Sequence, residues 1–312
     1  MRGASAIAAA GVLGASLALP TLALSPSDFE VEHLPGLDAE LNFTQYAGYM
    51  PINDGHGTEI FFWFVTSQND PAKDPLALWM NGGPGSSSIA YGFWTEHGPF
   101  RLADDGNGSY APELYEYSWN KIANVVYIEA PSGVGFSQST DHSKYENITD
   151  AQSSHDNFLF LEAFFDVFTD FKENDFYITA ESYGGHYGPT LAEQLLDNEN
   201  DINMKGFLIG NPGINSDWYY NVNEYAFTTF LAGHGLIPEV AYQQARRVCG
   251  WDDFFSNCST DFTHPSKECE DATKKAVRFA CVLLRVNDCM QLDFDLYVLT
   301  IVGLHPLPTG SM

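Results

Sequence analysis

A tight junction between a strand and a helix constrains the fold of this chain more than any other feature. The apolar run Phe176–Thr179 is typical of a strand, and helical spacing is found at about Pro189–Leu196. Between them stands Ala180-Glu-Ser182-Tyr-Gly184, with Ala where glycine is usual and Gly184 in place. Small residues are required because the two backbones nearly touch there, and the sharp turn pushes the Ser182 hydroxyl out of the sheet. The junction predicts a sheet whose strands lead into helices.

The chain alternates in the same way up to about Gly235. A helix with a stripe of apolar side chains is expected over Asp150–Phe171. Short apolar runs, most of them ending at Gly, Pro or Asn turns, predict further strands at Glu59–Val65, Leu76–Trp79, Val125–Glu129 and Gly206–Ile209. This alternation predicts an α/β fold with a mostly parallel sheet flanked by helices. After Gly235 the strand signals fade, and we expect a helical insertion that contains all five cysteines.

A second glycine-rich segment follows the predicted strand Leu76–Trp79. Asn81-Gly-Gly-Pro-Gly85 has adjacent glycines that leave backbone amides open to a ligand, as in the oxyanion loops of hydrolases. An acyl-transfer centre needs one amide from the residue after the nucleophile and another from an earlier loop. Tyr183 and Gly83 meet that requirement, which makes Ser182 the candidate nucleophile. The alternative is a structural turn that contains a serine by coincidence.

The charge balance excludes several classes of function. Acidic residues outnumber basic residues 41 to 14, which gives a formal net charge of −27. Such a surface repels nucleic-acid phosphates and anionic lipids, so neither is an expected partner. The cysteines lack zinc-site spacing and have no histidine at ligand spacing among them, so no metal is expected.

Residues 1–23 have the pattern of a secretory signal. Arg2 precedes the uncharged run Ala4–Leu19, and Thr21 and Ala23 are small residues spaced for cleavage. The run is short for a membrane anchor, and no later stretch reaches membrane-spanning length. We therefore expect a secretory route and an oxidising compartment. Four sequons agree with that route and are candidate glycosylation sites: Asn42, Asn107, Asn147 and Asn257.

Five motifs, in this order, resemble those of the serine carboxypeptidase family. They begin at Trp79 (Trp-Met-Asn-Gly-Gly-Pro-Gly), Glu96 (Glu-His-Gly-Pro-Phe), Ser118 (Ser-Trp-Asn-Lys-Ile-Ala-Asn, continuing to Ser137), Glu181 (Glu-Ser-Tyr-Gly-Gly-His-Tyr) and Gly210 (Gly-Asn-Pro). The resemblance runs from about Leu34 to about Pro238. It implies an α/β-hydrolase core over 24–238, a cysteine-rich helical insertion over 239–291 and a divergent tail over 292–312. It also implies an enzyme that releases C-terminal residues from peptides and proteins without a cofactor. Such an enzyme is expected to be secreted or to lie in a vacuole or lysosome.

The resemblance assigns roles to the matching positions. Ser182 would be the nucleophile, and the amides of Gly83 and Tyr183 would form the oxyanion hole. The C-terminal carboxylate of the substrate would be held by three groups, namely Asn81, the Gly82 amide and Glu181, with Glu96 hydrogen-bonded to Glu181. Glu181 must be protonated to donate to a carboxylate, and a neighbouring acid raises its pKa. The family is therefore expected to work best in acid.

The chain departs from the family pattern downstream of Ser182. The family carries a catalytic Asp and then a His on later strand ends, in Asn-Gly-Asp and Gly-His motifs, and neither motif occurs in a matching context. His305 and the acids before it lack a strand–loop context. The chain is therefore expected to be truncated or divergent at its C-terminal end. Without that Asp and His, Ser182 would be a weak nucleophile, so whether this chain is active or inactive stays open. An acyltransferase of the same family and a non-catalytic peptide-binding protein remain open as alternatives, as do the preferred residue and the oligomeric state.

Five cysteines in a secreted chain leave one unpaired. In the family, a cysteine after the Gly-Gly-Pro-Gly loop is bridged to a cysteine far downstream, and this chain has Ser86 at that position. The resemblance therefore implies that Cys289 is the free thiol. Two disulfides are expected among the other four cysteines, in one of three connectivities: Cys249, Cys258, Cys269 and Cys281.

Overall fold

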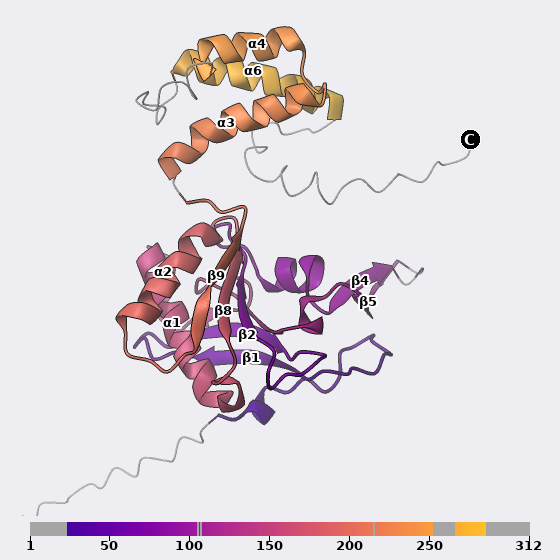
Figure 1. Ribbon diagram of the computed structural model, residues 1–312, viewed down its shortest axis with the longest axis vertical. Helices are drawn as coiled ribbons and strands as arrows, with labels where there is room; N and C mark the ends of the chain where they lie inside the picture. The colour runs from indigo at the N-terminus through magenta and orange to yellow at the C-terminus, as the bar shows by residue number, and fades with distance from the viewer. Residues whose placement is uncertain (1–23, 105, 107, 215, 252–265, 285–312) are drawn as a thin grey trace, which may run out of the picture. The chain divides into compact units, whose positions relative to one another are not determined.

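The computed structural model describes residues 24–104, 106, 108–214, 216–251 and 266–284 (Figure 1). The chain divides between Pro212 and Gly213 into two compact units, the first built on a sheet and the second helical. From the sequence we placed the start of the helical insertion at residue 239. The helix before that point, α3 (Ser216–Gly233), contacts the later helices α4 and α6. The predicted signal 1–23 and the tail 292–312 lie outside the described residues.

The first unit is centred on a mixed sheet of seven strands. The strands follow the order β1-β2-β6-β3-β8-β9, and the short strand β7 pairs with β2. β6, β3, β8 and β9 run parallel, whereas β2 is antiparallel to β1, β6 and β7. The bounds are β1 Gln45–Pro51, β2 Thr58–Val65, β3 Leu76–Met80, β6 Asn124–Ile128, β7 Gln138–Ser139, β8 Phe176–Glu181 and β9 Met204–Gly210. The predicted α/β fold is confirmed.

All five strands expected from the sequence are present, with ends shifted by at most two residues. They are β2, β3, β6, β8 and β9. The unit also contains an antiparallel hairpin outside the main sheet, formed by β4 (Phe100–Asp104) and β5 (Tyr110–Leu114). Short helical turns occupy five connections: η1 Pro26–Asp28, η2 Ile89–Glu96, η3 Trp119–Lys121, η4 His142–Tyr145 and η5 Thr169–Phe171.

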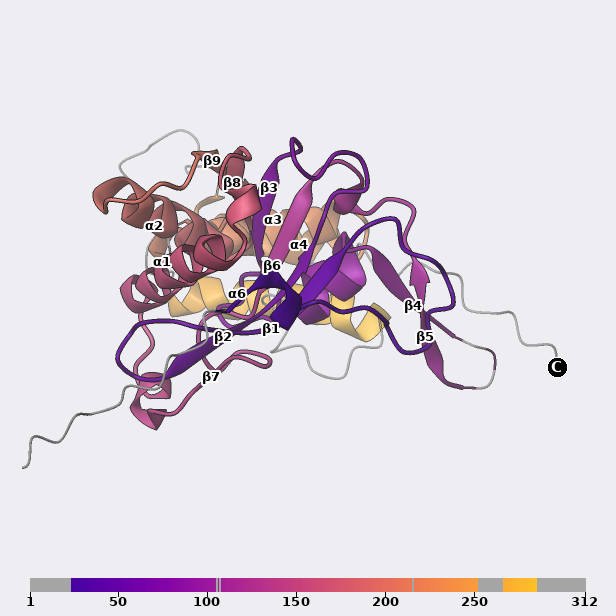
Figure 2. The same cartoon turned by 90° about the horizontal axis from the view of Figure 1, so that it is seen from below.

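Two long helices cover one face of the sheet, as Figures 1 and 2 show. α1 (Asp150–Val167) begins after Thr149, whose hydroxyl accepts a hydrogen bond from the Gln152 amide at 3.2 Å and so caps the helix. α2 (Gly184–Asp197) starts five residues before the helix expected from the sequence, directly after Tyr183. Within the described ranges, no helix is long and apolar enough to cross a membrane.

The alternation of side chains along the strands divides the core into two clusters. Leu78 and Met80 of β3 pack into the cluster beneath α1 and α2, together with buried phenylalanines such as Phe164 of the predicted apolar stripe. Trp79 points to the opposite face, where it packs with Phe93 and other buried aromatic side chains. The end of β3 is therefore held on both faces, which fixes the start of the segment Asn81–Gly85.

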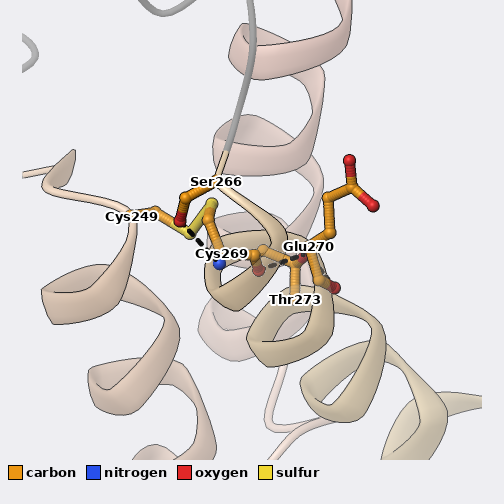
Figure 3. Close-up of a disulfide and its surroundings, with 5 residues drawn as sticks. All are labelled: Cys249, Ser266, Cys269, Glu270 and Thr273. Carbon is orange, nitrogen blue, oxygen red and sulfur yellow. Dashed lines mark hydrogen bonds between the residues drawn. A yellow bond between two sulfur atoms is a disulfide. The ribbon is translucent and has the colours of Figure 1, made fainter.

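The helical unit contains α3, α4 (Glu239–Val248) and α6 (Lys267–Leu284). Its small core is formed by Leu231, Ile237 and Ala276 with partly buried neighbours. A disulfide joins Cys249, just after α4, to Cys269 in the first turn of α6 (Figure 3). The Cys269 amide donates to the Ser266 hydroxyl at 3.2 Å, which caps α6 beside the disulfide.

The Cys249–Cys269 disulfide selects one of the three predicted connectivities. In that connectivity the second disulfide joins Cys258 to Cys281, which stays a prediction. Cys258 and Cys289 lie outside the described residues, and the side chain of Cys281 does too. Among the sequons, Asn42 and Asn147 are exposed, whereas Asn107 and Asn257 lie outside the described residues.

Candidate active site

Ser182 stands at the sharp turn between β8 and α2. Its φ angle is 56°, in the left-handed region that residues other than glycine rarely adopt. The Ser182 amide donates to the Gly210 carbonyl at 2.9 Å, which ties the turn to the end of β9. A side chain at Gly184 would overlap the Ala180 methyl group, so the small residues keep strand and helix in contact. The turn therefore has the backbone strain and tight packing expected of a nucleophile position.

The glycine-rich segment after β3 lies directly against this turn. A Cβ atom at Gly82 would overlap the Tyr183 amide nitrogen and would lie 2.7 Å from the Glu181 carbonyl oxygen. Gly83 has φ of 107°, a conformation that requires glycine. The Gly85 amide donates to the Tyr187 hydroxyl at 3.3 Å. Because these glycines have no side chains, the segment that contains Gly83 can pack next to the Tyr183 amide.

Asn81 joins the two glutamates singled out from the sequence. Its Nδ2 donates to Glu96 Oε1 at 3.0 Å and to Glu181 Oε1 at 3.5 Å. Its Oδ1 accepts from Trp79 Nε1 at 2.7 Å and from the Gly92 amide at 3.0 Å. These contacts fix which end of the amide faces the carboxyls. Glu96 and Glu181 therefore meet at the Asn81 amide, whereas the resemblance had implied a hydrogen bond between the two carboxyls.

Burial is the main reason that these carboxyls favour their neutral forms. It raises the pKa of Glu96 to about 7, the Glu181 charge adds to the rise, and Asn81 and Arg101 oppose it. Burial also raises the pKa of Glu181, against the hydrogen bond from Asn81. From the sequence we expected repulsion and proton sharing as the cause. Desolvation contributes more, and the pKa of each carboxyl is raised.

The histidines near these motifs have packing contacts. His97 is buried, its ring stacks on Trp119 at 4.0 Å, and its Nδ1 lies 3.1 Å from the Tyr127 hydroxyl. Burial lowers the pKa of His97 to about 3, which keeps it neutral. His186 stacks on Tyr183 with 4.4 Å between ring centroids. In the part of the chain that the structure describes, no imidazole or carboxylate hydrogen-bonds the Ser182 hydroxyl, and His305 lies outside that part.

Glu129 is a further acidic residue that helps to position the glycine-rich segment, and it was not singled out from the sequence. It is fully buried, and its Oε1 accepts from the Ser87 hydroxyl at 2.7 Å. Burial raises its pKa, and the Ser87 hydroxyl opposes the rise. A side chain at Gly135 would overlap the Glu129 carboxyl, so that glycine makes room for it. Glu129 thus anchors the segment after Gly85. In the sequence it could have been recognised as an acidic residue at the end of an apolar strand.

The chain is similar to several known proteins. The family model described as serine carboxypeptidase matches residues 35–300. Serine carboxypeptidase-like 26 of Oryza sativa is 39% identical over 241 residues, which cover 74% of this chain and 48% of that protein. Serine carboxypeptidase 1 of Hordeum vulgare is 39% identical over 246 residues, with 76% and 48% covered. The chain spans about half the length of the curated relatives it matches.

A solved structure shows a similar arrangement. It is that of Kex1(delta)p, a prohormone-processing carboxypeptidase from Saccharomyces cerevisiae, with a TM-score of 0.61 and 26% sequence identity. The match covers 82% of this chain and 58% of that one.

Proposed function

This chain belongs to the serine carboxypeptidase family, and we propose that the protein releases C-terminal amino acids from peptides through an acyl-enzyme on Ser182. One observation supports this more than any other. The strained turn at Ser182 directly follows Glu181, one of two half-buried carboxyls that meet at Asn81. A nucleophile beside a carboxylate-binding group is what cleavage at a free C-terminus requires.

The proposed reaction uses the site as follows. Protonated Glu181, the Asn81 Nδ2 and the Gly82 amide donate hydrogen bonds to the terminal carboxylate of the peptide. The Ser182 hydroxyl attacks the last peptide carbonyl, and the amides of Gly83 and Tyr183 stabilise the oxyanion. The terminal amino acid leaves as an amine, and water then hydrolyses the acyl-enzyme. The reaction needs a base for the Ser182 proton, and the described residues offer none in contact with the hydroxyl.

The secretory route and glycosylation stay proposals, supported by the leader pattern and by the exposure of Asn42 and Asn147. The disulfide between Cys249 and Cys269 agrees with an oxidising compartment.

The test is covalent labelling with a fluorophosphonate, followed by peptide mapping. We expect the adduct on Ser182 and none in the Ser182→Ala variant, together with release of the C-terminal residue from an N-blocked dipeptide. A folded protein that neither acquires the adduct nor releases an amino acid would refute the proposal. Saturable binding of the dipeptide without labelling would instead favour the peptide-binding alternative.

Substrate affinity is expected to fall as the pH rises. Glu181 and Glu96 have raised pKa values, with Glu96 at about 7, so the protonated fraction of each falls as the pH rises. The deprotonated carboxylates repel the substrate carboxylate, and KM should rise about tenfold between pH 5 and pH 8, a change of ~1.4 kcal/mol. Glu181→Gln keeps a neutral donor and should flatten this dependence. A wild-type KM that does not change over this range would contradict the assignment.

The same groups affect stability with a definite sign. Because the folded pKa of Glu96 lies above the unfolded value, the native state binds more protons between about pH 4.5 and 7. The free energy of unfolding should therefore decrease as the pH rises through that range, and Glu96→Gln should remove this contribution. This separates a buried acid from a solvated one, which would show no such slope.

A further inference from the structure

His97 is held in one orientation by the aromatic side chains around it. It directly follows η2 and is 7% exposed. Its ring stacks on Trp119 with 4.0 Å between ring centroids, and it packs edge to face with Trp79 at 4.1 Å. An imidazole enclosed in this way cannot turn toward other partners, because the neighbouring rings fill the space. The directions of its two nitrogens are therefore fixed.

The first nitrogen of His97 lies beside a buried hydroxyl. Its Nδ1 is 3.1 Å from the hydroxyl of Tyr127, which is fully buried. In the described part of the chain, the Tyr127 hydroxyl has no other hydrogen-bond partner. A buried hydroxyl needs an acceptor for its proton, so Tyr127 donates to Nδ1. Since burial lowers the pKa of His97 to about 3 and keeps the ring neutral, its one proton is on Nε2.

The second nitrogen lies near the Glu96 carboxyl. Nε2 is buried, and it has no hydrogen-bond partner among the residues that the structure describes. Glu96 Oε2 lies 3.9 Å from it, about 1 Å beyond the length of an ordinary N–H···O hydrogen bond. The Glu96 side chain is 27% exposed and that of His97 is 9% exposed, so Glu96 is the partner that can move. Contacts of this kind are often long in ligand-free sites and tighten in the complex.

Once this gap closes, each oxygen of Glu96 has its own donor. Asn81 Nδ2 already donates to Oε1 at 3.0 Å, and His97 Nε2 is available to Oε2. A carboxyl held at both oxygens cannot rotate, so its position beside Asn81 is fixed. Hydrogen bonds from N–H groups also favour the ionised form of a carboxyl and so oppose the effect of burial.

We propose that His97 is a positioning residue of the carboxylate site: its Nε2–H donates to Glu96 Oε2 and holds that carboxyl beside Asn81. Because this donor favours ionised Glu96, it limits how far burial raises the pKa of the carboxyl. His97 thereby sets the pH at which Glu96 loses its proton. The consequence for substrate affinity rests on the proposed carboxypeptidase function, whereas the contact between His97 and Glu96 does not.

The other charged or titratable neighbours of Glu96 come from three strands. Arg101 of β4 lowers the pKa of Glu96, and the charge of Glu181 of β8 raises it. Tyr127 of β6 keeps its proton, because burial raises its pKa well above the usual range. Variants at His97 leave these three groups in place, and His97 itself stays neutral from mildly acid to alkaline pH. A change in the titration of Glu96 therefore reports the loss of the Nε2–H.

The test follows the titration of Glu96 by ¹³C NMR of its carboxyl carbon, on the full chain labelled at glutamate and assigned with Glu96→Gln. Two variants separate the ring of His97 from its donor. His97→Phe keeps an aromatic ring and removes the N–H, whereas His97→Gln keeps an N–H near the position of Nε2 and removes the ring. We expect the titration midpoint to rise by about one pH unit in His97→Phe, as for the loss of one donor to a charged group. In His97→Gln it should stay at the parent value.

His142→Phe is the matched control, because His142 is an exposed histidine on η4 and the substitution is the same. Its Glu96 midpoint should equal that of the parent. An unchanged midpoint in His97→Phe, or an equal rise in His97→Gln, would overturn the inference. A lower midpoint in His97→Phe would also overturn it, because protonated Glu96 would then donate to His97.

A measurement on the parent chain decides even if His97→Phe fails to fold. The ¹⁵N shifts of the His97 ring identify the nitrogen that carries the proton. We expect the proton on Nε2, and we expect the Nε2 shift to change as Glu96 titrates. A proton on Nδ1, or an Nε2 shift that does not respond to Glu96, would contradict the contact.

The two proposals fail in different ways, because none of these NMR measurements uses a substrate. A raised Glu96 midpoint in His97→Phe without fluorophosphonate labelling of Ser182 would refute the carboxypeptidase function and leave the role of His97 standing. Labelling of Ser182 with the same Glu96 midpoint in every variant would refute the role of His97 and leave the function standing.

Discussion

Gly82→Ala is expected to lower the rate of Ser182 acylation by about 10²–10³-fold, the loss typical of removing one oxyanion donor. The added methyl group would overlap the Tyr183 amide nitrogen and lie 3.0 Å from the Ser182 Cβ. These are backbone and nucleophile atoms, so no flexible side chain can move aside. The segment of Gly83 would be displaced from the amide of Tyr183, and the two donors would no longer face one oxyanion. The second-order rate constant of fluorophosphonate labelling measures the effect.

The matched control is Gly206→Ala on β9. A Cβ at Gly206 meets nothing within 4 Å, so it adds the same methyl group without a clash. Its labelling rate should stay within about twofold of the parent, because surface changes away from special features are nearly neutral. Overpacking at Gly82 also costs about 1–3 kcal/mol of stability, so rates are compared per folded protein. A Gly82→Ala variant that is labelled at the parent rate would show that close packing at Gly82 does not set the oxyanion geometry.

The buried strands could be predicted because their apolar runs fill both faces of the sheet. β3 and β6 are buried at every residue, so sequence alone located them almost to the residue. β1 was not predicted, since Gln45–Pro51 contains polar, aromatic and glycine residues on a partly exposed edge. The hairpin β4–β5 was missed for a similar reason, because three of the five β5 residues are exposed.

The start of α2 shows where local preference fails. Gly184, Gly185 and Gly188 are poor helix formers, so helical spacing was found only from Pro189. In the structure these glycines form the first turns of the helix, where a side chain at Gly188 would press against Ile209 of β9. Packing of the helix against the sheet outweighs the intrinsic cost of glycine. Sequence patterns describe each element alone and do not contain this contact.

The candidate site could likewise be predicted only in part. Asn81, Glu96 and Glu181 could be predicted from the sequence alone, because each is part of a specific motif. The geometry of their meeting, with both carboxyls on the Asn81 amide, depends on three segments far apart in the chain. Such sites arise from tertiary packing and become visible only there.

Lys144→Met is expected to destabilise the protein by about 3–5 kcal/mol at neutral pH, the loss typical of breaking a buried ion pair. The Lys144 Nζ lies 2.9 Å and 3.0 Å from the Asp156 oxygens and 3.0 Å from Asp54 Oδ2. All three side chains are at most 5% exposed. They join the β1–β2 connection, the η4 turn and α1. Removing the lysine leaves two carboxylates buried near each other without a cation.

The loss should be smaller in acid. Burial already raises the pKa of Asp156 against the attraction of Lys144, whereas hydrogen bonds from Thr58, the His56 amide and Lys144 lower that of Asp54 to about 2 despite its burial. Without Lys144 both folded pKa values rise, so the native state of the variant binds extra protons in acid. Its free energy of unfolding should therefore increase, relative to the parent, as the pH falls from 7 toward 4.5.

Lys172→Met provides the control, because Lys172 also lies between two aspartates but at the surface. Its Nζ is 3.0 Å from Asp201 and 3.7 Å from Asp166, whose side chains are 74% and 80% exposed. Water solvates those carboxylates after the lysine is removed, so the urea midpoint should hardly change. Urea unfolding at pH 7 and pH 4.5 compares the two variants. Equal, small losses for both lysines would mean that water reaches Asp54 and Asp156, and that the buried triad does not hold α1 to the sheet.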